Sequence, residues 1–169
     1  TGYQWKWKYE YINDDGENIS FFSVLKTPIE EIYNEEAKGE HYLLEVDEPV
    51  VIPVDTKVRF LITAYDVIHS WWVPALAVKK DGIPGFINET WAKSNKIGIY
   101  RGQCAELCGV NHAFMPIEVH AVTDKVFQQW VKTQTLDTSS IAKNLASLPA
   151  EHPVLSRKAL MKEGKKKYE

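Results

Sequence analysis

The sequence predicts an all-β Greek-key barrel or sandwich that ends in a short helix and an extension. Three observations carry this prediction: most apolar segments are short and rich in Val, Ile and Leu, turn-forming residues separate them, and helical spacing occurs only late in the chain. A hydrophobic content of 44% over 169 residues is enough to bury one core. We therefore expect one domain over residues 1–135 and a partly disordered extension over 136–169.

The first strand pair is expected at the beginning of the chain. Aromatic and polar residues alternate over residues 3–9, which is the two-residue period of a strand and would place Trp5 and Trp7 on the same face. A turn is expected over residues 13–16, and residues 19–25 would return as the second strand.

The next segment, residues 26–40, is acidic and lacks an apolar stripe, so we expect an inserted loop with one helical turn. The remaining strands are expected over residues 41–54, 57–64, 71–78, 96–101 and 117–122, with turns at 81–82 and 84–85. Residues 124–134 begin with an N-cap candidate and have apolar residues at helical spacing, which predicts the helix.

Charge is unevenly distributed along the chain. The formal net charge is −3, but residues 156–169 hold six basic residues against two acidic ones, which leaves −7 on the rest. Residues 9–48 alone carry twelve acids against two lysines. Such a field favours a basic partner and disfavours nucleic acid. The chain has no run of about 18 apolar residues and no signal-peptide pattern at its start, so we expect it to be soluble as given.

The residues with metal-binding chemistry are concentrated in the run CAELCGVNHAFM, and one further histidine precedes it in the chain. The ligand candidates are His69, Cys104, Cys108, His112 and Met115. These soft and borderline donors suit copper. A single-copper electron-transfer site needs only one thiolate, so one is left over. Two thiolates that bridge two copper ions, with one histidine on each ion, use every ligand. Met115 and the carbonyl oxygen of Glu106 would then occupy the weak axial positions.

Other interpretations of these residues remain open. Two cysteines at this spacing also permit a disulfide, which would leave the histidines and Met115 without a purpose. Zinc on two Cys and two His leaves Met115 unexplained. A copper-delivery or thiol-redox protein would use similar residues, but on a thioredoxin-like α/β pattern that this sequence lacks.

Three segments together resemble cytochrome c oxidase subunit II. They are TGYQWKWKYEY, DVIHSWWVPALAVKKDGIPG and YRGQCAELCGVNHAFMPI, in the family's order, and the similarity extends over residues 1–130. The resemblance implies a cupredoxin-type fold and a mixed-valence, two-copper CuA centre. Its ligands would be the five residues above and the main-chain oxygen of Glu106. The Glu106 side chain would bind magnesium only in the full complex, at the contact with subunit I.

The resemblance also implies partners. The family's domain takes an electron from reduced cytochrome c and passes it to the haem of subunit I, without reducing oxygen itself. Trp5 matches the family's surface tryptophan through which the electron enters, although the alternation of residues 3–9 favours a core position. The residues expected to dock the donor are Gln4, Glu10, Asp47 and Asp66. Asp66 has a second interpretation, since it lies three residues before His69 and could orient that ligand.

Two lysines beside Trp5, Lys6 and Lys8, depart from an acidic docking face and would weaken or shift the binding of a basic cytochrome. By resemblance the domain faces the periplasm of a bacterium, attached to the inner membrane by segments that precede the chain. The CuA domain of nitrous oxide reductase shares the ligand run. That enzyme also needs a large catalytic domain and lacks an opening of the TGYQWKW type.

Overall fold

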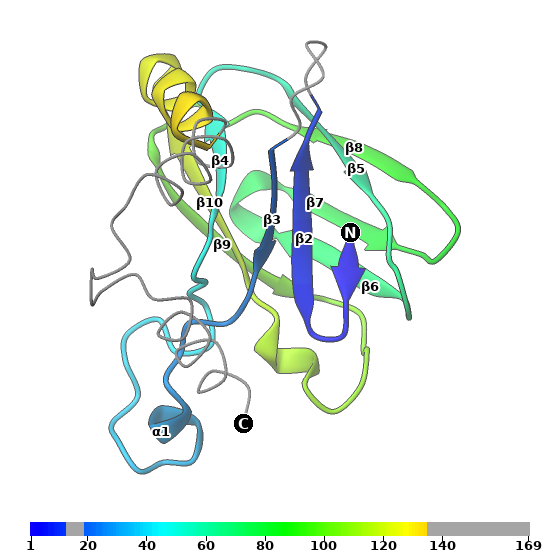
Figure 1. The fold of residues 1–169 in the computed structure, drawn as a ribbon, viewed down its shortest axis with the longest axis vertical. Coiled ribbons are helices and arrows are strands. Elements are labelled where there is room, and N and C mark those ends of the chain that lie inside the picture. Colours follow the sequence, from blue (N-terminus) through cyan, green and yellow to red (C-terminus); the bar gives the residue numbers. More distant parts are fainter. Residues whose placement is uncertain (13–18, 135–169) are drawn as a thin grey trace, which may run out of the picture. The chain divides into compact units, whose positions relative to one another are not determined.

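The computed structural model describes residues 1–12 and 19–134, and this part of the chain contains ten strands in three sheets (Figure 1). The first sheet has the order β1-β2-β3, with β1 at Gly2–Tyr3, β2 at Lys6–Tyr11 and β3 at Ile19–Ser23. The second has the order β4-β10-β9-β6-β7, with β4 at Val50–Pro53, β6 at His69–Val73, β7 at Val78–Gly82, β9 at Gly98–Cys104 and β10 at Ile117–Val122. The third pairs β5 (Val58–Ile62) with β8 (Asn88–Ala92). Among these strands only β4 and β10 pair in parallel.

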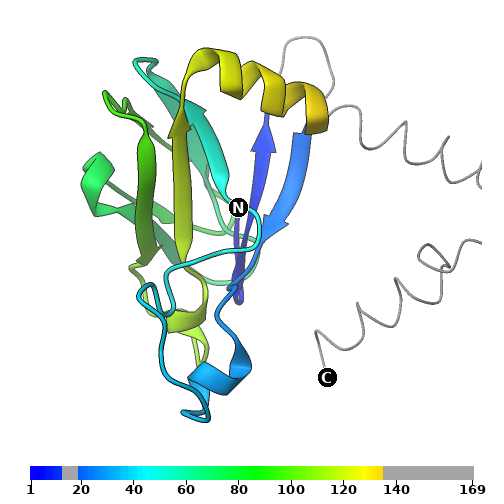
Figure 2. The same cartoon turned by 90° about the vertical axis from the view of Figure 1, so that its left-hand side faces the viewer.

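The sheets enclose one core. Figure 2 shows β2 and β3 (blue) facing β4, β9 and β10 (cyan to yellow-green), with the helix over residues 124–134 (yellow) across one end. Strand β10 shows why the core forms here, because its alternate residues Ile117, Val119 and Ala121 are almost completely buried. Burial of a side chain as large as Ile117 or Val119 contributes about 1.5–3 kcal/mol. The largest core side chains are Trp7 and Trp71.

Several predictions are confirmed. The molecule is all-β with a late helix, β10 spans the predicted residues 117–122, and the acidic segment 26–40 contains one short helix, α1 (Ile29–Ile32). The helix of residues 124–134 packs Trp130 against Tyr11, with ring centroids 4.9 Å apart. In the part of the chain that the structure describes, no helix has the length and apolar character to span a membrane.

Other predictions were wrong in detail. Of residues 41–54 only Val50–Pro53 form a strand, because the preceding residues turn back on themselves. Asp47 holds this turn by accepting the N–H groups of Val24 and Glu48. The predicted strand 71–78 is interrupted at Pro74, which starts the 3-10 turn η1 (Pro74–Leu76) because proline has no N–H to donate to a strand.

Strand β7 contains the Asp81-Gly82 pair that was assigned to a turn, and β8 was not predicted. The predicted turn at 13–16 and the extension 136–169 lie outside the described residues. The chain divides into two compact units, Thr1–Val131 and Lys132–Glu169, and all the sheets belong to the first. The domain boundary at residue 135 stays a prediction.

Candidate metal centre

Strand pairing brings the first two candidate ligands together. His69 is the first residue of β6 and Cys104 is the last residue of β9, and these strands pair with Trp71 opposite Cys104. The N–H of Ala105 extends the pairing by donating to the Ser70 carbonyl at 2.9 Å. As a result the Cys104 Sγ lies 3.9 Å from the His69 Nδ1 although 35 residues separate them in the chain.

The loop that follows β9 brings in the other ligands. The Cys108 Sγ lies 3.9 Å from the Cys104 Sγ, and both cysteines are buried and free. On the Cys108 side, the His112 Nδ1 is 3.3 Å and the Met115 Sδ 3.5 Å from the sulfur. On the Cys104 side, the Glu106 carbonyl oxygen is 3.3 Å from the sulfur. All six predicted donors therefore converge, and each sulfur has its own histidine and its own weak donor.

This donor set fits copper better than the alternatives. A disulfide requires sulfurs about 2.05 Å apart, whereas these are 3.9 Å apart. A tetrahedral zinc site would use two Cys and two His but would leave the Met115 thioether and the Glu106 carbonyl without a role. Among the described residues, His69, Cys104 and Cys108 form the one group of His, Cys, Asp or Glu close enough to hold a metal ion.

The two thiols differ in acidity. Burial opposes ionisation of Cys104, but hydrogen bonds from His69 and from the Ser70 and Glu106 main chain outweigh it, so its pKa lies below the ordinary value. Burial, and then the negative charge of Cys104, raise the pKa of Cys108 to about 12. Without a cation the pair therefore favours a single negative charge. A metal that binds both sulfurs has to supply the charge that ionises the second.

His69 is oriented by Asp66. Its Nε2 lies 2.9 Å from the Asp66 Oδ1, which leaves Nδ1 facing the sulfurs. Burial lowers the pKa of His69, but the hydrogen bonds to Cys104 and Asp66 more than offset this, so the pKa is raised. Asp66 also accepts the N–H groups of Gln4 and Val67 at 2.8 and 2.7 Å. These bonds overcome its partial burial and lower the pKa of its carboxyl group. The hydrogen bond that the orienting role of Asp66 requires is thus present.

Two residues at the centre were missed by sequence reasoning. The rings of Trp7 and His69 meet edge to face, with centroids 5.9 Å apart, and the Trp7 Nε1 donates to the Met115 carbonyl at 3.3 Å. Gly2 lies directly against the His69 ring, since a Cβ at this position would come within 2.7 Å of the imidazole Cδ2. The alternation in residues 3–9 indicated only that Trp7 is buried, and no signal in the sequence marked Gly2.

Trp5 packs against the core but is only partly buried and is not part of β2, so the prediction that it shares a strand face with Trp7 was wrong. A turn at Gln4 and Trp5 separates β1 from β2 and interrupts the alternation. Trp7 is 1% exposed, whereas Trp5 is half-buried with its Nε1 3.2 Å from the Cys108 carbonyl. Gln4 donates to the same carbonyl at 2.8 Å. Gly109, whose φ of +119° favours glycine, leaves room for the Trp5 ring, since a Cβ there would lie 3.0 Å from it.

The predicted docking residues divide into two groups. Gln4 and Asp66 meet beside Trp5 at the ligand loop, as the bonds above show. Glu10 lies toward the other end of β2 and pairs with Lys8 at 2.9 Å. Asp47 belongs to the turn before β4, where its carboxylate is engaged with main-chain N–H groups.

Comparisons with known proteins agree with this geometry. Residues 1–122 match the family described as cytochrome c oxidase subunit II, periplasmic domain. The chain is 50% identical over 132 residues to the probable cytochrome c oxidase subunit 2 of Rickettsia prowazekii (strain Madrid E), a match that covers 78% of this chain and 40% of the relative. It is 48% identical over 130 residues to cytochrome c oxidase subunit 2 of Branchiostoma floridae, covering 77% of this chain and 54% of the relative.

Solved structures give the same family. The periplasmic domain of subunit II of cytochrome oxidase (CoxB) of Bradyrhizobium japonicum superposes with a TM-score of 0.70 and 42% identity, covering 82% of this chain and 91% of that one. A mixed disulfide intermediate between thioredoxin-like TlpAs and a cytochrome c oxidase subunit II matches with a TM-score of 0.61 and 40% identity, covering 79% and 85%. The chain belongs to the family of cytochrome c oxidase subunit II periplasmic domains. It spans about half the length of the curated relatives named above.

Proposed function

We propose that this domain receives electrons singly from reduced cytochrome c at a two-copper CuA centre and delivers them to the haem of subunit I. The observation that supports it is the convergence of two free sulfurs, 3.9 Å apart, with a separate imidazole and a separate weak donor at each. When bound, a copper pair held by both thiolates would supply a one-electron redox centre in which the charge is shared by two metal ions.

The chain's own residues would keep this centre rigid. Asp66 fixes the ring of His69, and Trp7 fixes the main chain at Met115 through its Nε1. Because these contacts hold the donor groups in place, the donor atoms need little movement when the charge of the site changes. Burial of both sulfurs and of Met115 excludes water from the centre.

We propose Trp5 as the residue through which the electron enters. It is half-exposed, and its Nε1 contacts the carbonyl of the ligand Cys108, so it links the surface to the centre through one hydrogen bond. Gln4 and Asp66 hold the turn that carries it. Glu10 and Asp47 are proposed to attract a basic donor over longer range.

Two further parts of the proposal come from the family. The Glu106 side chain is exposed while its carbonyl faces Cys104, so the carboxylate is free to bind magnesium at a contact with subunit I. The domain is proposed to face the periplasm at a bacterial inner membrane. Since a related subunit II forms a mixed disulfide with a thioredoxin-like protein, we also propose that such a protein keeps Cys104 and Cys108 reduced before copper binds.

Copper stoichiometry with electron paramagnetic resonance tests the centre. The expected result is two copper ions per chain and the signal of one unpaired electron, split by both copper nuclei. His112→Asn should abolish this signal, while His120→Asn, in a histidine bonded to Glu118 on β10, should leave it intact. One copper per chain, or splitting from a single nucleus, would contradict the proposal.

Reduction kinetics test Trp5. Trp5→Phe removes the bond to the Cys108 carbonyl and is expected to slow reduction by cytochrome c at least tenfold without changing the copper spectrum. Trp91→Phe is the matched control, because Trp91 is 56% exposed but lies on β8. If cytochrome c reduced the Trp5 and Trp91 variants at the same rate, the electron would have to enter the domain through a residue other than Trp5.

A further inference from the structure

Three aromatic residues form a continuous surface across β1, β3 and the loop before β6. The ring of Tyr3 stacks on Tyr65, with centroids 5.0 Å apart and planes at 21°, and meets Phe22 edge-on at 5.7 Å. Tyr65 is 73% exposed and Phe22 44% exposed. Single exposed aromatics are ordinary, but a contiguous exposed group indicates an interaction surface. We call Tyr3, Phe22 and Tyr65 the aromatic platform.

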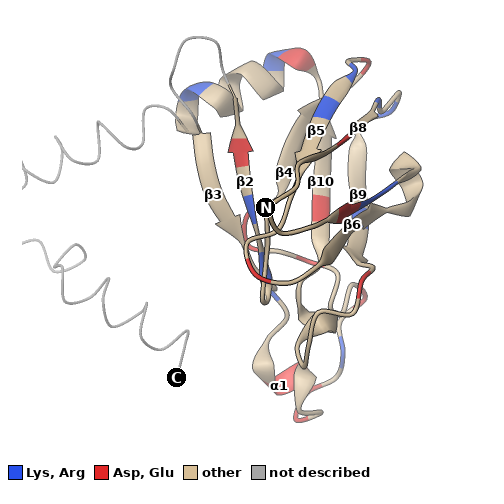
Figure 3. Ribbon diagram, turned by 90° about the vertical axis from the view of Figure 1, so that its right-hand side faces the viewer, with Lys and Arg blue, Asp and Glu red and all other residues tan. Residues whose placement is uncertain are grey.

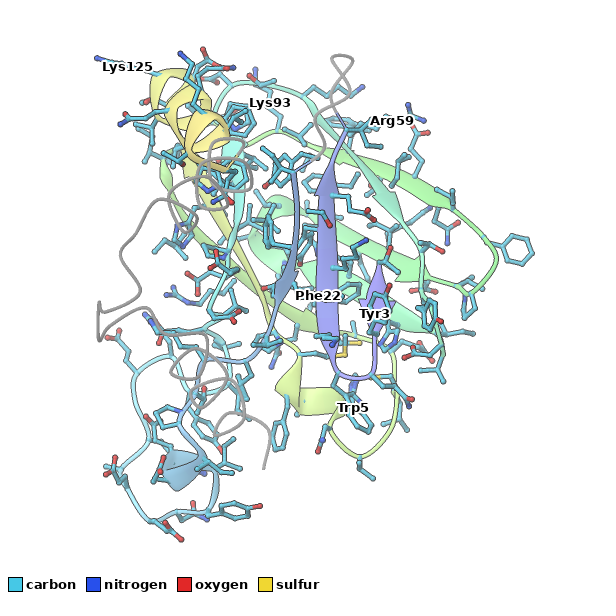
Figure 4. The ribbon with its side chains drawn as sticks, in the orientation of Figure 1. Tyr3, Trp5, Phe22, Arg59, Lys93 and Lys125 are labelled. Atoms are coloured by element: carbon cyan, nitrogen blue, oxygen red, sulfur yellow. The ribbon has the colours of Figure 1, made fainter. Side chains whose placement is uncertain are left out.

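The platform is joined to the turn that carries Trp5. The N–H of Tyr65 donates to the Gly2 carbonyl at 2.9 Å, and the neighbouring Asp66 accepts the N–H of Gln4 at 2.8 Å. Figure 4 shows Tyr3 and Phe22 on the face toward the viewer, with Trp5 at the turn below them. A partner that touches Trp5 on this face is therefore placed to touch the platform as well.

The charges around the platform are already engaged within the chain. The Lys6 Nζ lies 4.5 Å from the centre of the Phe22 ring, and Lys8 pairs with Glu10 at 2.9 Å. The carboxylate of Asp66 is held by two main-chain N–H groups and by His69. Figure 3 shows both signs of charge along β2. A partner that presented lysines here would meet Lys6 and find the nearby acids occupied.

Other acidic groups are concentrated in a separate loop, where Glu31 accepts the Gly39 N–H at 2.8 Å. The loop with α1 carries Glu30, Glu31, Glu35 and Glu36, and it lies at the same end of the molecule as the ligand loop in both Figure 1 and Figure 2. Such a field acts over a distance and raises association rates, whereas contact determines how long the complex lasts. Long-range attraction by the α1 loop and direct contact with the partner are thus carried by different surfaces.

Resting on the proposed function, we propose that the aromatic platform is the contact surface for the electron donor. The partner that fits it is a haem protein whose exposed haem edge is surrounded by apolar, uncharged side chains, with its basic groups outside the contact. Flat apolar groups pack against aromatic faces and edges. The donor's haem edge would thereby lie beside Trp5, next to the Cys108 carbonyl.

The test is stopped-flow reduction of the copper-loaded chain by a soluble c-type cytochrome, with hexaammineruthenium(II) as a small reductant that needs no docking. Tyr65→Ser and Phe22→Ser should each raise the apparent Kd for the cytochrome about tenfold, and the rate with the ruthenium complex should not change. Tyr33→Ser is the matched control, because Tyr33 is 68% exposed at the end of α1. Lys6→Glu should strengthen binding of a lysine-rich cytochrome and steepen its salt dependence.

The outcomes separate the two proposals. If Tyr65→Ser and Phe22→Ser bind and react like Tyr33→Ser while Trp5→Phe remains slow, the platform is overturned and the proposed function stands. If Trp5→Phe is also unaffected, the route through Trp5 fails with it. A steep fall of the rate with salt that is the same in the wild type and in Tyr65→Ser would show that carboxylates make the contact, and would likewise overturn the platform.

Discussion

The two halves of the metal centre are built differently. In the Cys104 half, the imidazole of His69 is fully buried and held by Asp66, Trp7 and Gly2, and two paired strands supply the ligands. The Cys108 half is a loop in which His112 is only half-buried on the short turn η2 (His112–Phe114).

The residues beside Cys108 in the loop are also open to solvent. Leu107 is 79% and Val110 89% exposed, and the Cys108 carbonyl is reached from outside by Gln4 and Trp5. We therefore expect the first half to provide stability and metal retention, and the second half to lie on the side where the electron donor is proposed to bind. Changes to the first half should therefore alter folding and copper binding before they alter electron exchange.

The largest effect is expected from Gly2→Val, which breaks the buried half directly. A Cβ at Gly2 would lie within 2.7 to 3.0 Å of three atoms of the His69 side chain, none of which can move without displacing the ligand. We expect a loss of up to about 3 kcal/mol in the free energy of unfolding of the copper-free chain, measured by urea titration, together with weak copper binding. Gly98→Val is the control, because only Tyr100 at 3.9 Å lies near its Cβ. Equal stability of the two variants would show that β1 does not confine His69.

Asp66→Ala should give the next largest effect. It removes the acceptor of the His69 Nε2 and of two main-chain N–H groups, so both the ligand orientation and the Trp5 turn lose support. Loss of a partner that orients a metal-binding histidine typically lowers metal affinity by about 10- to 100-fold. Competition with a copper chelator measures this affinity. Asp47→Ala, which also removes an acceptor of two main-chain N–H groups, should leave it unchanged. A similar affinity in both variants would contradict the orienting role.

Trp7→Phe should have a smaller effect on stability. It tests the comparison between the two halves because Trp7 contacts His69 in one half and Met115 in the other. The substitution keeps an aromatic ring near His69 but leaves the Met115 carbonyl without its buried donor. An unsatisfied buried acceptor costs about 1–3 kcal/mol, so thermal unfolding should occur at lower temperature. Because Met115 is a weak donor on the Cys108 side, the reduction potential should also shift, as voltammetry would show. An unchanged potential with lowered stability would limit Trp7 to a packing role.

The convergence of the six donor groups was predictable from the sequence, whereas the contacts that support them were not. Cys104, Cys108, His112 and Met115 occur within twelve residues, so counting donors was enough to suggest two metal ions. The contacts of Trp7 and Gly2 depend on β1 and β2 packing against β6, which are distant in the chain. Local periodicity carries no information about such packing.

The errors have the same origin. The turn at Gln4-Trp5 contains no Gly, Pro, Asn or Asp, so the alternation of residues 3–9 predicted one continuous strand. Residues 42–46, which are apolar except for Glu45, suggested a strand, but Thr27 and Asp47 bind the main chain into turns instead.

The smallest expected effect concerns Tyr9. Its hydroxyl group accepts a hydrogen bond from the Trp71 Nε1 at 3.1 Å, and Trp71 lies on β6, the strand that begins with His69. Burial raises the pKa of Tyr9 far above its ordinary value of 10.0, and the same cause raises that of Tyr11. The folded protein therefore keeps both protons at pH values where the unfolded chain releases them. The contribution of these two tyrosines to stability is fully present below pH 10 and declines above it, by about 1.4 kcal/mol per pH unit for each tyrosine.

In the copper-free chain the thiol of Cys108, whose pKa is raised to about 12, adds a third such group. Tyr9→Phe removes one of the three groups, so the decline in unfolding free energy between pH 10 and 11 should be about two-thirds as steep as in the wild type. Urea titrations across this range measure the slope. Tyr33→Phe, at an exposed position, should keep the wild-type slope. Since the lost hydrogen bond to Trp71 lowers stability equally at every pH, only the slope distinguishes the proton linkage of Tyr9 from its packing. An unchanged slope in Tyr9→Phe would mean that Tyr9 ionises in the folded protein. Water would then have access to the Tyr9 hydroxyl group on β2.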